Sequence, residues 1–349
     1  MHPDILKAYG FTGEEPVVTA FGSGLINHTW KVSYMGNDYI LQRINDNVFK
    51  QPADITSNIS LLATYLKQHH PGYFFVAPVK TIHGDEMVFL KDEGYFRMFP
   101  FVAGSHSKDV LKTAAEAYEA AMQFGKFTKL LAGINISQLK ISIPDFHNLS
   151  LRYQQFLEAL KNGNRQRIEE TKALANELTS HAAIVAEYEN ITSNSNFKLR
   201  VTHHDTKISN VLFDDTGKGL CVIDLDTVMP GYFISDVGDM MRTYLSPVSE
   251  EEKDFSKIII RDDFYEAIVK GYHNEMKDEL SSTEKKYFFY AGTFMIYMQA
   301  IRFFTDYLNN DIYYGSKYPG HNLVRATNQS VLLQRLLQKE KTLSRIIEN

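Results

Sequence analysis

Residues 201–210 read VTHHDTKISN and residues 222–226 read VIDLD, and these two segments decide the fold of this chain of 349 residues. The first segment fits the pattern H-x-D-x-x-x-x-N, in which Asp205 is the acidic residue and Asn210 the amide. The second segment ends an apolar run with two aspartates. Apolar, β-prone residues precede both sets of polar side chains, which predicts two short strands that each lead into a polar loop.

The chemistry of phosphoryl transfer explains why these residue types occur at this spacing. The reaction needs a carboxylate that aligns the acceptor hydroxyl and accepts its proton, and Asp205 can supply that group from a loop. It also needs oxygen ligands for Mg²⁺, which Asn210 and Asp224 can supply through an amide oxygen and a carboxylate. Asp226 is either a further metal ligand or a residue that orients the loop. The alternative is a polar turn with a purely structural role, and it would require these residue types to occur at both spacings by chance.

The composition is that of a globular protein. Hydrophobic residues make up 44% of the chain and charged residues 23%, which excludes a disordered or low-complexity chain. The net charge is −5, with 37 Lys and Arg against 42 Asp and Glu and no basic block, so we expect no nucleic-acid partner. The one cysteine, Cys221, lies in an apolar run and is expected to be a buried strand residue and no nucleophile.

The sequence also predicts where the protein resides. The first residues have neither the basic nor the apolar region of a signal peptide. The longest apolar stretch, residues 288–301, is too short to span a bilayer and contains Thr293 and Gln299. We therefore predict a cytoplasmic protein with no membrane partner.

The order of β-prone and helical patterns predicts an α+β chain with two lobes. A helix is expected at residues 54–69, among strands at residues 17–21, 30–34, 39–43, 74–79, 81–90 and 95–99. Helical spacing then dominates, within residues 113–132, 151–190, 263–275, 281–308 and 323–347, around a β island at residues 199–229. We expect a small β-rich lobe at residues 1–101, a hinge near residues 97–108 and a large helical lobe at residues 102–349.

With these motifs the chain resembles the protein-kinase-like phosphotransferases that act on aminoglycosides, choline and homoserine. Within that family it is most similar to the N-acetylhexosamine 1-kinases, through the segments HHDTKISNVLFD, GLCVIDLDTVMPG, RFFTDYLNNDIYY and HNLVRA. The kinase motifs cover residues 17–245, and the segments similar to the sugar kinases extend the resemblance to residue 330.

This resemblance implies a fold and an activity. The fold would be a bilobal protein-kinase-like fold, with a small antiparallel β-rich N-terminal lobe and a large, mainly helical C-terminal lobe. The activity would be that of a monomeric enzyme that uses ATP and Mg²⁺ to phosphorylate the anomeric 1-hydroxyl of an N-acetylhexosamine, GlcNAc or GalNAc.

The same resemblance assigns nucleotide-binding residues. The gap between the first two strands is similar to the glycine-rich loop that covers the phosphates in kinases, and a plain β-turn is its alternative; its relevant residues are Gly22, Ser23, Gly24, Asn27 and Thr29. Adenine is expected against residues 95–102, at Met98, Phe99 and Phe101. The third strand has no lysine for the phosphates, so Arg43 is expected to replace it, with Asn58 in place of the usual helix glutamate. Arg97 is a competing cation for which we favour a structural role.

Catalytic and acceptor residues are implied in the same way. Lys207 is expected to point toward the γ-phosphate and His203 to brace the catalytic loop. Asp236 and Asp239 are expected to be structural and to cap a helix. The acceptor is expected to contact His28, Asp205, Tyr244, Arg302 and Tyr313.

Alternatives stay open at this point. Arg302 lies in an apolar run, where a structural ion pair with Asp306 is the alternative to a sugar contact. The same fold could act on choline, homoserine, an aminoglycoside or another sugar, although Arg302 disfavours a polycationic aminoglycoside. A pseudokinase that only binds nucleotide is a further alternative, which the intact Asp205, Asn210 and Asp224 disfavour.

Overall fold

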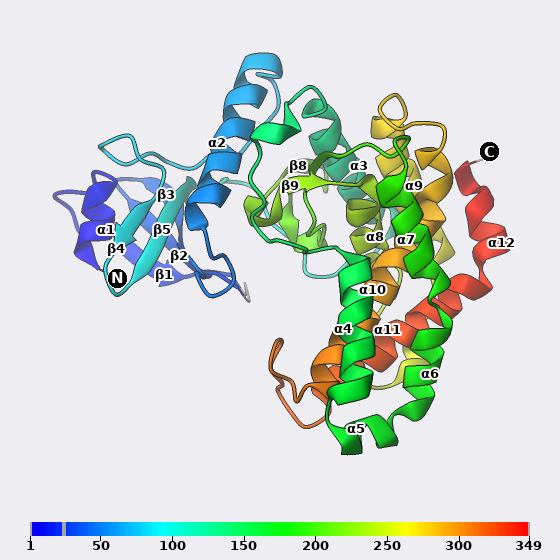
Figure 1. The fold of residues 1–349 in the computed structure, drawn as a ribbon. Helices are drawn as coiled ribbons and strands as arrows, with labels where there is room; N and C mark the ends of the chain where they lie inside the picture. Colours follow the sequence, from blue (N-terminus) through cyan, green and yellow to red (C-terminus); the bar gives the residue numbers. More distant parts are fainter. Residues whose placement is uncertain (1, 23–25, 348–349) are drawn as a thin grey trace. The chain divides into compact units, whose positions relative to one another are not determined.

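The structure of the protein is a computed structural model that describes residues 2–22 and 26–347 (Figure 1). Ser23 and Gly24 of the expected glycine-rich loop lie outside the described residues. The chain forms two compact units; the first comprises Met1–His106, Gly133–Pro144 and Leu212–Pro230, and the second comprises Ser107–Ala132, Asp145–Val211 and Gly231–Asn349. The predicted lobe boundary between residues 101 and 102 stays a prediction.

An antiparallel sheet forms the centre of the first unit, as its β-prone runs predict. Within the described part of the chain its five strands lie in the order β1 (Val17–Ala20), β2 (His28–Tyr34), β3 (Asn37–Ile44), β5 (Gly94–Pro100) and β4 (Val88–Leu90). The β2–β3 hairpin turns at Met35 and Gly36, whose φ values of 47° and 76° are the left-handed conformation that a tight hairpin turn requires. The expected antiparallel arrangement of this part of the chain is therefore confirmed.

One predicted strand is absent, and another is shorter than predicted. Residues 74–79 form no strand, and in the run at residues 81–90 only β4 belongs to the sheet. Pro78 has no N–H to donate to a neighbouring strand. Gly84 turns the chain with a φ of 89°, and its N–H donates to the carbonyl oxygen of Thr81. Apolar composition favoured β structure here, but the backbone forms irregular chain and a turn.

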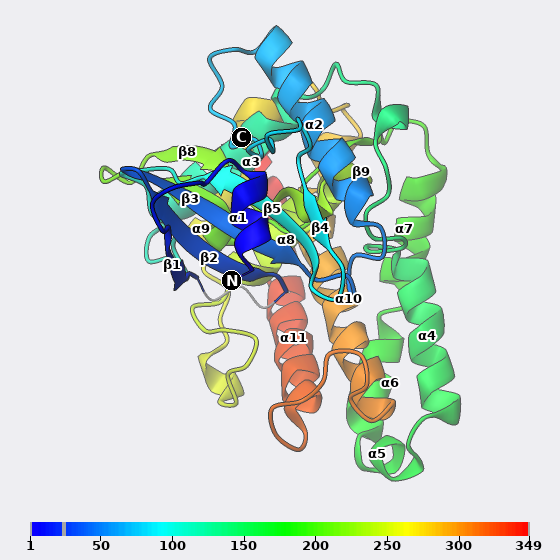
Figure 2. The same ribbon diagram turned by 90° about the vertical axis from the view of Figure 1, so that its left-hand side faces the viewer.

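Helix α1 (Pro3–Ala8) covers one face of the sheet (Figure 2). Ile5 and Leu6 of this helix share an apolar core with strand residues that include Leu41 and Met98. Residues that pair directly across antiparallel strands point to the same face, and neighbours along a strand point to opposite faces. The face opposite α1 therefore carries the alternate residues of β3 and β5.

Further elements of the first unit follow their predicted patterns. Helix α2 (Pro52–His69) buries Ile55, Ile59 and Leu62 at the spacing that predicted it. Strands β7 (Val211–Phe213) and β8 (Gly219–Val222) pair with one another. Cys221 is fully buried in β8, and this burial raises the pKa of its thiol to about 12, as expected for a core residue and not for a nucleophile.

The second unit is mainly helical, as its sequence pattern predicts. Its longest helix, α10 (Phe288–Leu308), packs against α8 (Phe233–Tyr244), α11 (His321–Gln338) and α4 (Leu149–Asn162), and α3 (Ala114–Leu130) packs against α9 (Asp262–Met276) (Figure 1). The remaining α-helices and β-strands of the described chain are α5 (Arg165–Glu170), α6 (Lys172–Ser180), α7 (Ala183–Ser193), β6 (Arg200–Thr202), β9 (Met229–Gly231) and α12 (Glu340–Leu343). The expected helical region at residues 151–190 therefore spans several separate helices.

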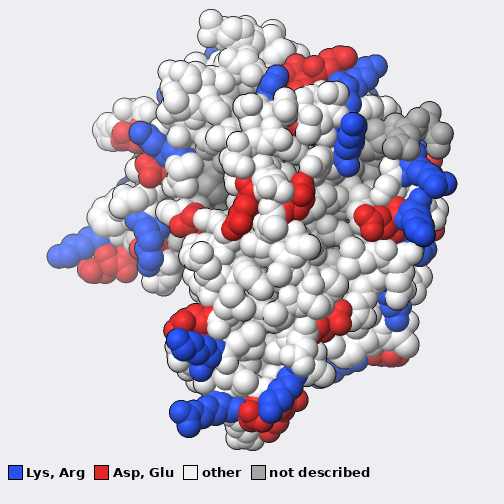
Figure 3. All heavy atoms as spheres, turned by 45° about the vertical axis from the view of Figure 1, so that its right-hand side comes forward, with Lys and Arg blue, Asp and Glu red and all other residues white. Residues whose placement is uncertain are grey.

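Helix α8 lies unusually close to α10. A Cβ added at Gly238 would lie 2.3 Å from the carbonyl oxygen of Ala291, so only glycine permits this approach. The contact fixes α8, which carries Asp236 and Asp239. None of the helices in the described residues has the length and apolar composition needed to cross a membrane. On the face seen in Figure 3, basic and acidic side chains are interspersed.

Candidate active site

Two aspartates of α8 hold the backbone of the H-x-D loop, residues 203–210. The carboxylate of Asp236 accepts the N–H groups of His203 and His204, at 3.1 and 2.7 Å. The carboxylate of Asp239 accepts the N–H of Thr206 at 2.8 Å. Burial raises the pKa of Asp236 to about 6, and the His203 ring and the two N–H groups oppose that rise. The loop is thus fixed from inside the second unit.

Asp236 and Asp239 are structural residues, as expected, but the prediction that they cap a helix is wrong. No side chain caps α8 at Tyr232, and both carboxylates receive N–H groups of the H-x-D loop instead. Their role is structural, as expected, but it serves the loop and not the helix. The position of both aspartates near the start of a helix indicated a capping role. The packing of the H-x-D loop on α8 gives the two carboxylates backbone N–H groups of that loop as partners instead.

Asp205 lies at the accessible side of this loop, with Lys207 and Asn210 beside it. Lys207 Nζ is 3.0 Å from Asp205 Oδ2, and the Asp205 side chain is 20% exposed. Asn210 donates from Nδ2 to the Asp205 carbonyl oxygen at 2.8 Å and to Asp205 Oδ2 at 3.2 Å. The side-chain N–H groups of Asn210 thus donate to Asp205. The side-chain oxygen of Asn210 is of the type that Mg²⁺ prefers as a ligand. The structure brings together these three residues predicted from one motif.

His203 is a buried brace, as the resemblance implied. Its Nδ1 accepts the N–H of Asp205 at 3.3 Å, and its ring meets the ring of Phe124 edge to face at 5.2 Å between centroids. His204 follows it with a φ of 66°, a left-handed conformation that is uncommon outside glycine. Gly231 leaves space for this residue, because an added Cβ would lie 2.4 Å from His204 Cε1.

Tyr244 is buried inside the second unit, whereas the sequence predicted that it contacts the sugar. Its side chain is 1% exposed, and its hydroxyl donates to the carbonyl oxygen of Thr206 at 2.6 Å. Burial, with the nearby carboxylates of Asp239 and Asp205, raises the pKa of this hydroxyl well above its ordinary value, so it stays a donor. Tyr244 is thus placed to position the H-x-D loop.

We expect Tyr244→Phe to destabilise the protein by about 1–2 kcal/mol, because the Thr206 carbonyl would lose a buried donor. We also expect a lower kcat with an unchanged KM for the acceptor, since the loop would be less well fixed. Urea unfolding and steady-state kinetics on one preparation measure both effects. An increased acceptor KM at unchanged stability would instead return Tyr244 to the acceptor site.

Arg302 does not form the ion pair with Asp306 that was its structural alternative. Asp306 accepts the N–H groups of Tyr313 and Tyr314, at 2.7 and 2.9 Å, and the side-chain amide of Asn322. Arg302 instead donates a hydrogen bond from Nη1 to Gln299 Oε1 at 3.3 Å. The Asp306 carboxylate, which the helical spacing predicted as a partner of Arg302, therefore binds backbone N–H groups of the loop after α10.

Aromatic rings surround the guanidinium group of Arg302. Its central carbon lies 5.8 Å from the ring centroid of Phe146, 6.0 Å from that of Tyr313 and 5.6 Å from that of Tyr314. The Tyr313 residue is 69% exposed. These rings could stack against the apolar face of a sugar while the guanidinium donates to oxygen atoms.

His147 and Arg152 also belong to this cluster, and sequence reasoning missed both. Burial lowers the pKa of His147 well below its ordinary value, and the nearby His204 and Arg302 add to the effect, which favours the neutral ring. Burial and Arg302 lower the pKa of Arg152. Neither residue lies in a recognisable motif, so the sequence offered no signal for them.

In the first unit, Asp226 is occupied by protein partners. Its Oδ1 lies 2.5 Å from Arg97 Nη2, and its Oδ2 accepts from Asn27 Nδ2 at 2.7 Å. Asp226 is 2% exposed. Of its two predicted roles, the geometry favours orientation of the chain over metal binding, because Oδ2 accepts a hydrogen bond and Oδ1 is in ion-pair contact with Arg97.

Asp224 differs from Asp226 in its exposure to solvent. It is exposed, at the end of β8, and its φ of 60° is in the left-handed region that aspartate tolerates better than most residues. An exposed carboxylate is a suitable ligand for Mg²⁺, which binds to proteins through one or two carboxylates together with substrate phosphates. Asp224 therefore fits the metal-ligand role expected from the sequence.

The described part of the glycine-rich loop has the expected backbone freedom. Gly22 is exposed with a φ of 75°, and a Cβ added there would meet no atom within 4 Å. Asn27 connects the end of the loop to Asp226 and, through its Oδ1, to the N–H of Asn45 at 3.0 Å. Thr29 accepts a long hydrogen bond from Gln42 at 3.5 Å.

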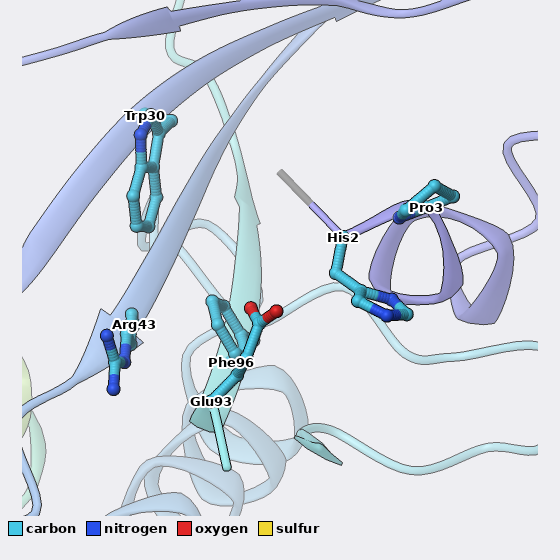
Figure 4. A pocket seen from close by; sticks show the side chains of 6 residues that line it. All are labelled: His2, Pro3, Trp30, Arg43, Glu93 and Phe96. Carbon is cyan, nitrogen blue, oxygen red and sulfur yellow. The ribbon is translucent and has the colours of Figure 1, made fainter. Parts of the chain in front are cut away.

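Arg43 lies on the face of the sheet that α1 covers. It pairs across the strands with His28 and Phe96, whereas its neighbour Gln42 pairs with Thr29 and Arg97. Figure 4 shows Arg43 beside Phe96 at a cavity of about 440 Å³, which is also lined by His2, Pro3, Trp30 and Glu93. The structure therefore places Arg43 and the pair of Arg97 and Asp226 on opposite faces.

The residues of this unit that were expected to contact adenine or the sugar also lie on both faces of the sheet. Met98 is fully buried in the core beneath α1, so its side chain is not available to a base. Phe99 lies on the other face, near Arg97, and Phe101 packs edge to face with Phe21 at 5.9 Å. His28 is exposed and lies near Trp30 on the Arg43 face.

Comparison with known proteins adds independent findings. The sequence pattern of the phosphotransferase enzyme family matches residues 17–280. The fold is similar to that of an aminoglycoside phosphotransferase from Alicyclobacillus acidocaldarius, with a TM-score of 0.64 and 13% identity over 100% of this chain and 96% of that one. A microcompartment-associated aminopropanol kinase gives a TM-score of 0.65 and 15% identity over 98% and 97% of the two chains.

A spectinomycin phosphotransferase in complex with ADP and spectinomycin gives a TM-score of 0.60 and 13% identity, over 97% of this chain and 97% of that one. These identities are low, so the solved structures establish a common fold and no more. Together with the antiparallel sheet and the mainly helical second unit, they confirm the kinase-like α+β fold expected from the sequence.

Proposed function

Because the chain belongs to the phosphotransferase enzyme family, we propose that it transfers the γ-phosphoryl group of ATP to the anomeric 1-hydroxyl of an N-acetylhexosamine, with Mg²⁺ as cofactor. The family supports transfer to a small hydroxyl acceptor. The ADP bound to the spectinomycin phosphotransferase of the same fold supports the use of a nucleotide. The choice of sugar depends on the residues around Arg302.

Each residue of the H-x-D loop has a role in this proposal. Asp205 aligns the acceptor hydroxyl and accepts its proton, while Asn210 keeps the carboxylate oriented by its two hydrogen bonds. Lys207, 3.0 Å from that carboxylate, offers positive charge to the transferred group. Asn210, through its amide oxygen, and Asp224, through its carboxylate, are the residues that would hold Mg²⁺. When bound, this ion neutralises charge on the phosphates.

The observation that carries the choice of acceptor is the positive charge of Arg302 and Arg152, and the carboxylate of Asp145 acts on Arg152 at longer range. Arg302 donates to Gln299, and Arg152 donates to Gln155 and to the carbonyl oxygen of Asp145. Neither has a carboxylate in ion-pair contact among the residues that the structure describes. The ammonium groups of an aminoglycoside or an aminopropanol would be repelled here, whereas the hydroxyl and acetamido oxygens of a sugar would accept these N–H groups.

We expect Arg302→Ala to raise the KM for the N-acetylhexosamine and to lower kcat/KM for it roughly tenfold or more, because a charged hydrogen bond to the acceptor is lost. The KM for ATP is expected to stay unchanged. Arg165→Ala, at an exposed arginine of α5, is the matched control. A lower melting temperature of Arg302→Ala with an unmoved sugar KM would mean that Arg302 is structural.

Acceptor specificity is tested with a panel. ATP consumption by the wild-type protein is measured with N-acetylhexosamines, simple hexoses, choline, ethanolamine, homoserine and an aminoglycoside at equal concentrations. We expect the N-acetylhexosamines to give the highest kcat/KM, and NMR of the product to locate the phosphate at C1. Preference for an amino alcohol or an aminoglycoside would contradict the sugar proposal and leave family membership intact. ATP binding without turnover of any acceptor would favour the pseudokinase alternative.

A further inference from the structure

We infer that Arg97 of β5, and not Arg43 of β3, supplies the positive charge that holds the nucleotide phosphates. This inference rests on the proposed use of ATP. Kinases usually place this charge on a lysine of the third strand, which forms an ion pair with a helix glutamate. In this chain the third strand offers Gln42 and Arg43, and α2 contains no glutamate.

The register of the sheet separates the two arginines. Gln42 pairs directly with Arg97, and Arg43 pairs directly with Phe96. Direct partners across antiparallel strands point to the same face, so Gln42 and Arg97 share one face and Arg43 lies on the other. Phe96 belongs to the apolar core that α1 covers. A phosphate group bound on the Gln42 face is therefore beyond the reach of Arg43.

Arg97 is held firmly on the Gln42 face. Its Nε and Nη2 donate to Gln42 Oε1, at 3.1 and 2.9 Å, and its Nη2 lies 2.5 Å from Asp226 Oδ1. The neutral side chain at the third-strand position thus serves as an acceptor for the arginine of the neighbouring strand. Asp226 provides the carboxylate that a helix glutamate provides in other kinases.

One donor of Arg97 has no partner. The residue is 1% exposed, and its Nη1 has no hydrogen-bond acceptor among the described residues. A buried donor without an acceptor is unfavourable, and a guanidinium group pairs well with phosphate oxygens. A phosphate oxygen of the nucleotide would supply the acceptor that the protein lacks.

The same network connects Arg97 to the loop that is expected to cover the phosphates. Asp226 Oδ2 accepts from Asn27, the last loop residue before β2, at 2.7 Å. Asn27 also accepts the N–H of Asn45, just after β3. Asn58 of α2 does not take part, because its amide group is engaged with backbone groups of Lys140 and Val228. Asp226 thus orients both the cation and the end of the loop.

The experiment compares ATP with adenosine, which has the base and the ribose but no phosphate. Dissociation constants of both ligands are measured by calorimetry without Mg²⁺, for the full-length wild-type protein and three variants. These are Arg97→Met, Arg43→Met and the double variant Gln42→Lys/Arg97→Met, which moves the positive charge to the third strand.

We expect Arg97→Met to weaken ATP binding roughly tenfold or more, since a charge-assisted contact is lost, while adenosine binding changes by no more than about twofold. Arg43→Met should change neither constant by more than about twofold. The double variant should recover most of the lost ATP affinity, because a lysine at position 42 lies on the same face as Arg97.

Three results would overturn the inference. The first is an ATP affinity of Arg97→Met equal to that of the wild type. The second is a loss of ATP affinity in Arg43→Met as large as that expected for Arg97→Met. The third is an equal loss of ATP and adenosine binding in Arg97→Met, which would make Arg97 a structural residue only. If Arg97→Met does not fold, the double variant and Arg43→Met decide: tight ATP binding by both supports the inference, and weak binding by Arg43→Met overturns it. Failure of the wild-type protein to bind ATP would instead contradict the proposed function.

Discussion

Asp205→Asn is expected to lower kcat by roughly 10²–10⁴-fold, the range that a general base contributes, while ATP binding changes by no more than about twofold. The substitution keeps the shape of the side chain and an oxygen that can accept from Lys207 and Asn210. It removes the charge that, in the proposed function, accepts the proton of the acceptor hydroxyl. The hydrogen bonds from the loop backbone to Asp236 and Asp239 do not involve this side chain, so the fold should persist.

Single-turnover kinetics, calorimetric ATP titration and a melting curve check this expectation on one preparation. Asp278→Asn, at an exposed aspartate of the same unit, is the matched control and should match the wild type in all three. A kcat near that of the wild type for Asp205→Asn would mean that another group accepts the proton.

Asp224→Asn is expected to lower kcat/KM for ATP at millimolar Mg²⁺ roughly 10²-fold or more, because the proposed metal ligand would lose its charge. Asparagine is the informative replacement, since the φ of 60° at this position would strain alanine but is tolerated by asparagine. Saturating acceptor should not restore activity. ATP binding measured without Mg²⁺ should be unchanged, and the gain in affinity on adding Mg²⁺ should be smaller than in the wild type.

The variant Asp226→Asn is the comparison for Asp224→Asn, because the two aspartates belong to the same motif. Asp226 is buried against Arg97 and Asn27, so its neutralisation leaves Arg97 without a charged partner and should lower the melting temperature. Asp224 is exposed, and Asp224→Asn should leave the melting temperature nearly unchanged. Normal turnover of Asp224→Asn at millimolar Mg²⁺ would remove Asp224 from the metal site.

Residues that act through neighbours in the chain could be predicted from the sequence. Asp205, Lys207 and Asn210 lie within residues 205–210, so the sequence places them in one loop. Their contacts with one another depend on how Asp236 and Asp239 hold that loop. Cys221 was predictable for a related reason, because an apolar run with β-prone residues is seldom exposed. The helical spacing of α2 likewise specified which of its residues are buried.

Contacts between distant segments were not predictable in this way. Arg302 and Asp306 have the spacing of a helical ion pair, yet Asp306 binds the backbone of Tyr313 and Tyr314 after the chain has turned. A backbone N–H group has the same chemistry in every residue, so nothing in the sequence marked these two as partners. Tyr244 gave no sign that its hydroxyl would meet the carbonyl oxygen of Thr206.

The sequence by itself determined most strands of the sheet, the helical periodicities and the spacing of the polar residues in the two motifs, because each depends on residues close together in the chain. The tertiary structure alone decided which arginine shares a face with Asp226. Neighbouring residues of a strand point to opposite faces, so Gln42 and Arg43 must separate, but the pattern does not specify which face is covered. The packing of α1 against Leu41 and Met98 specifies it, and with it the position of Arg97.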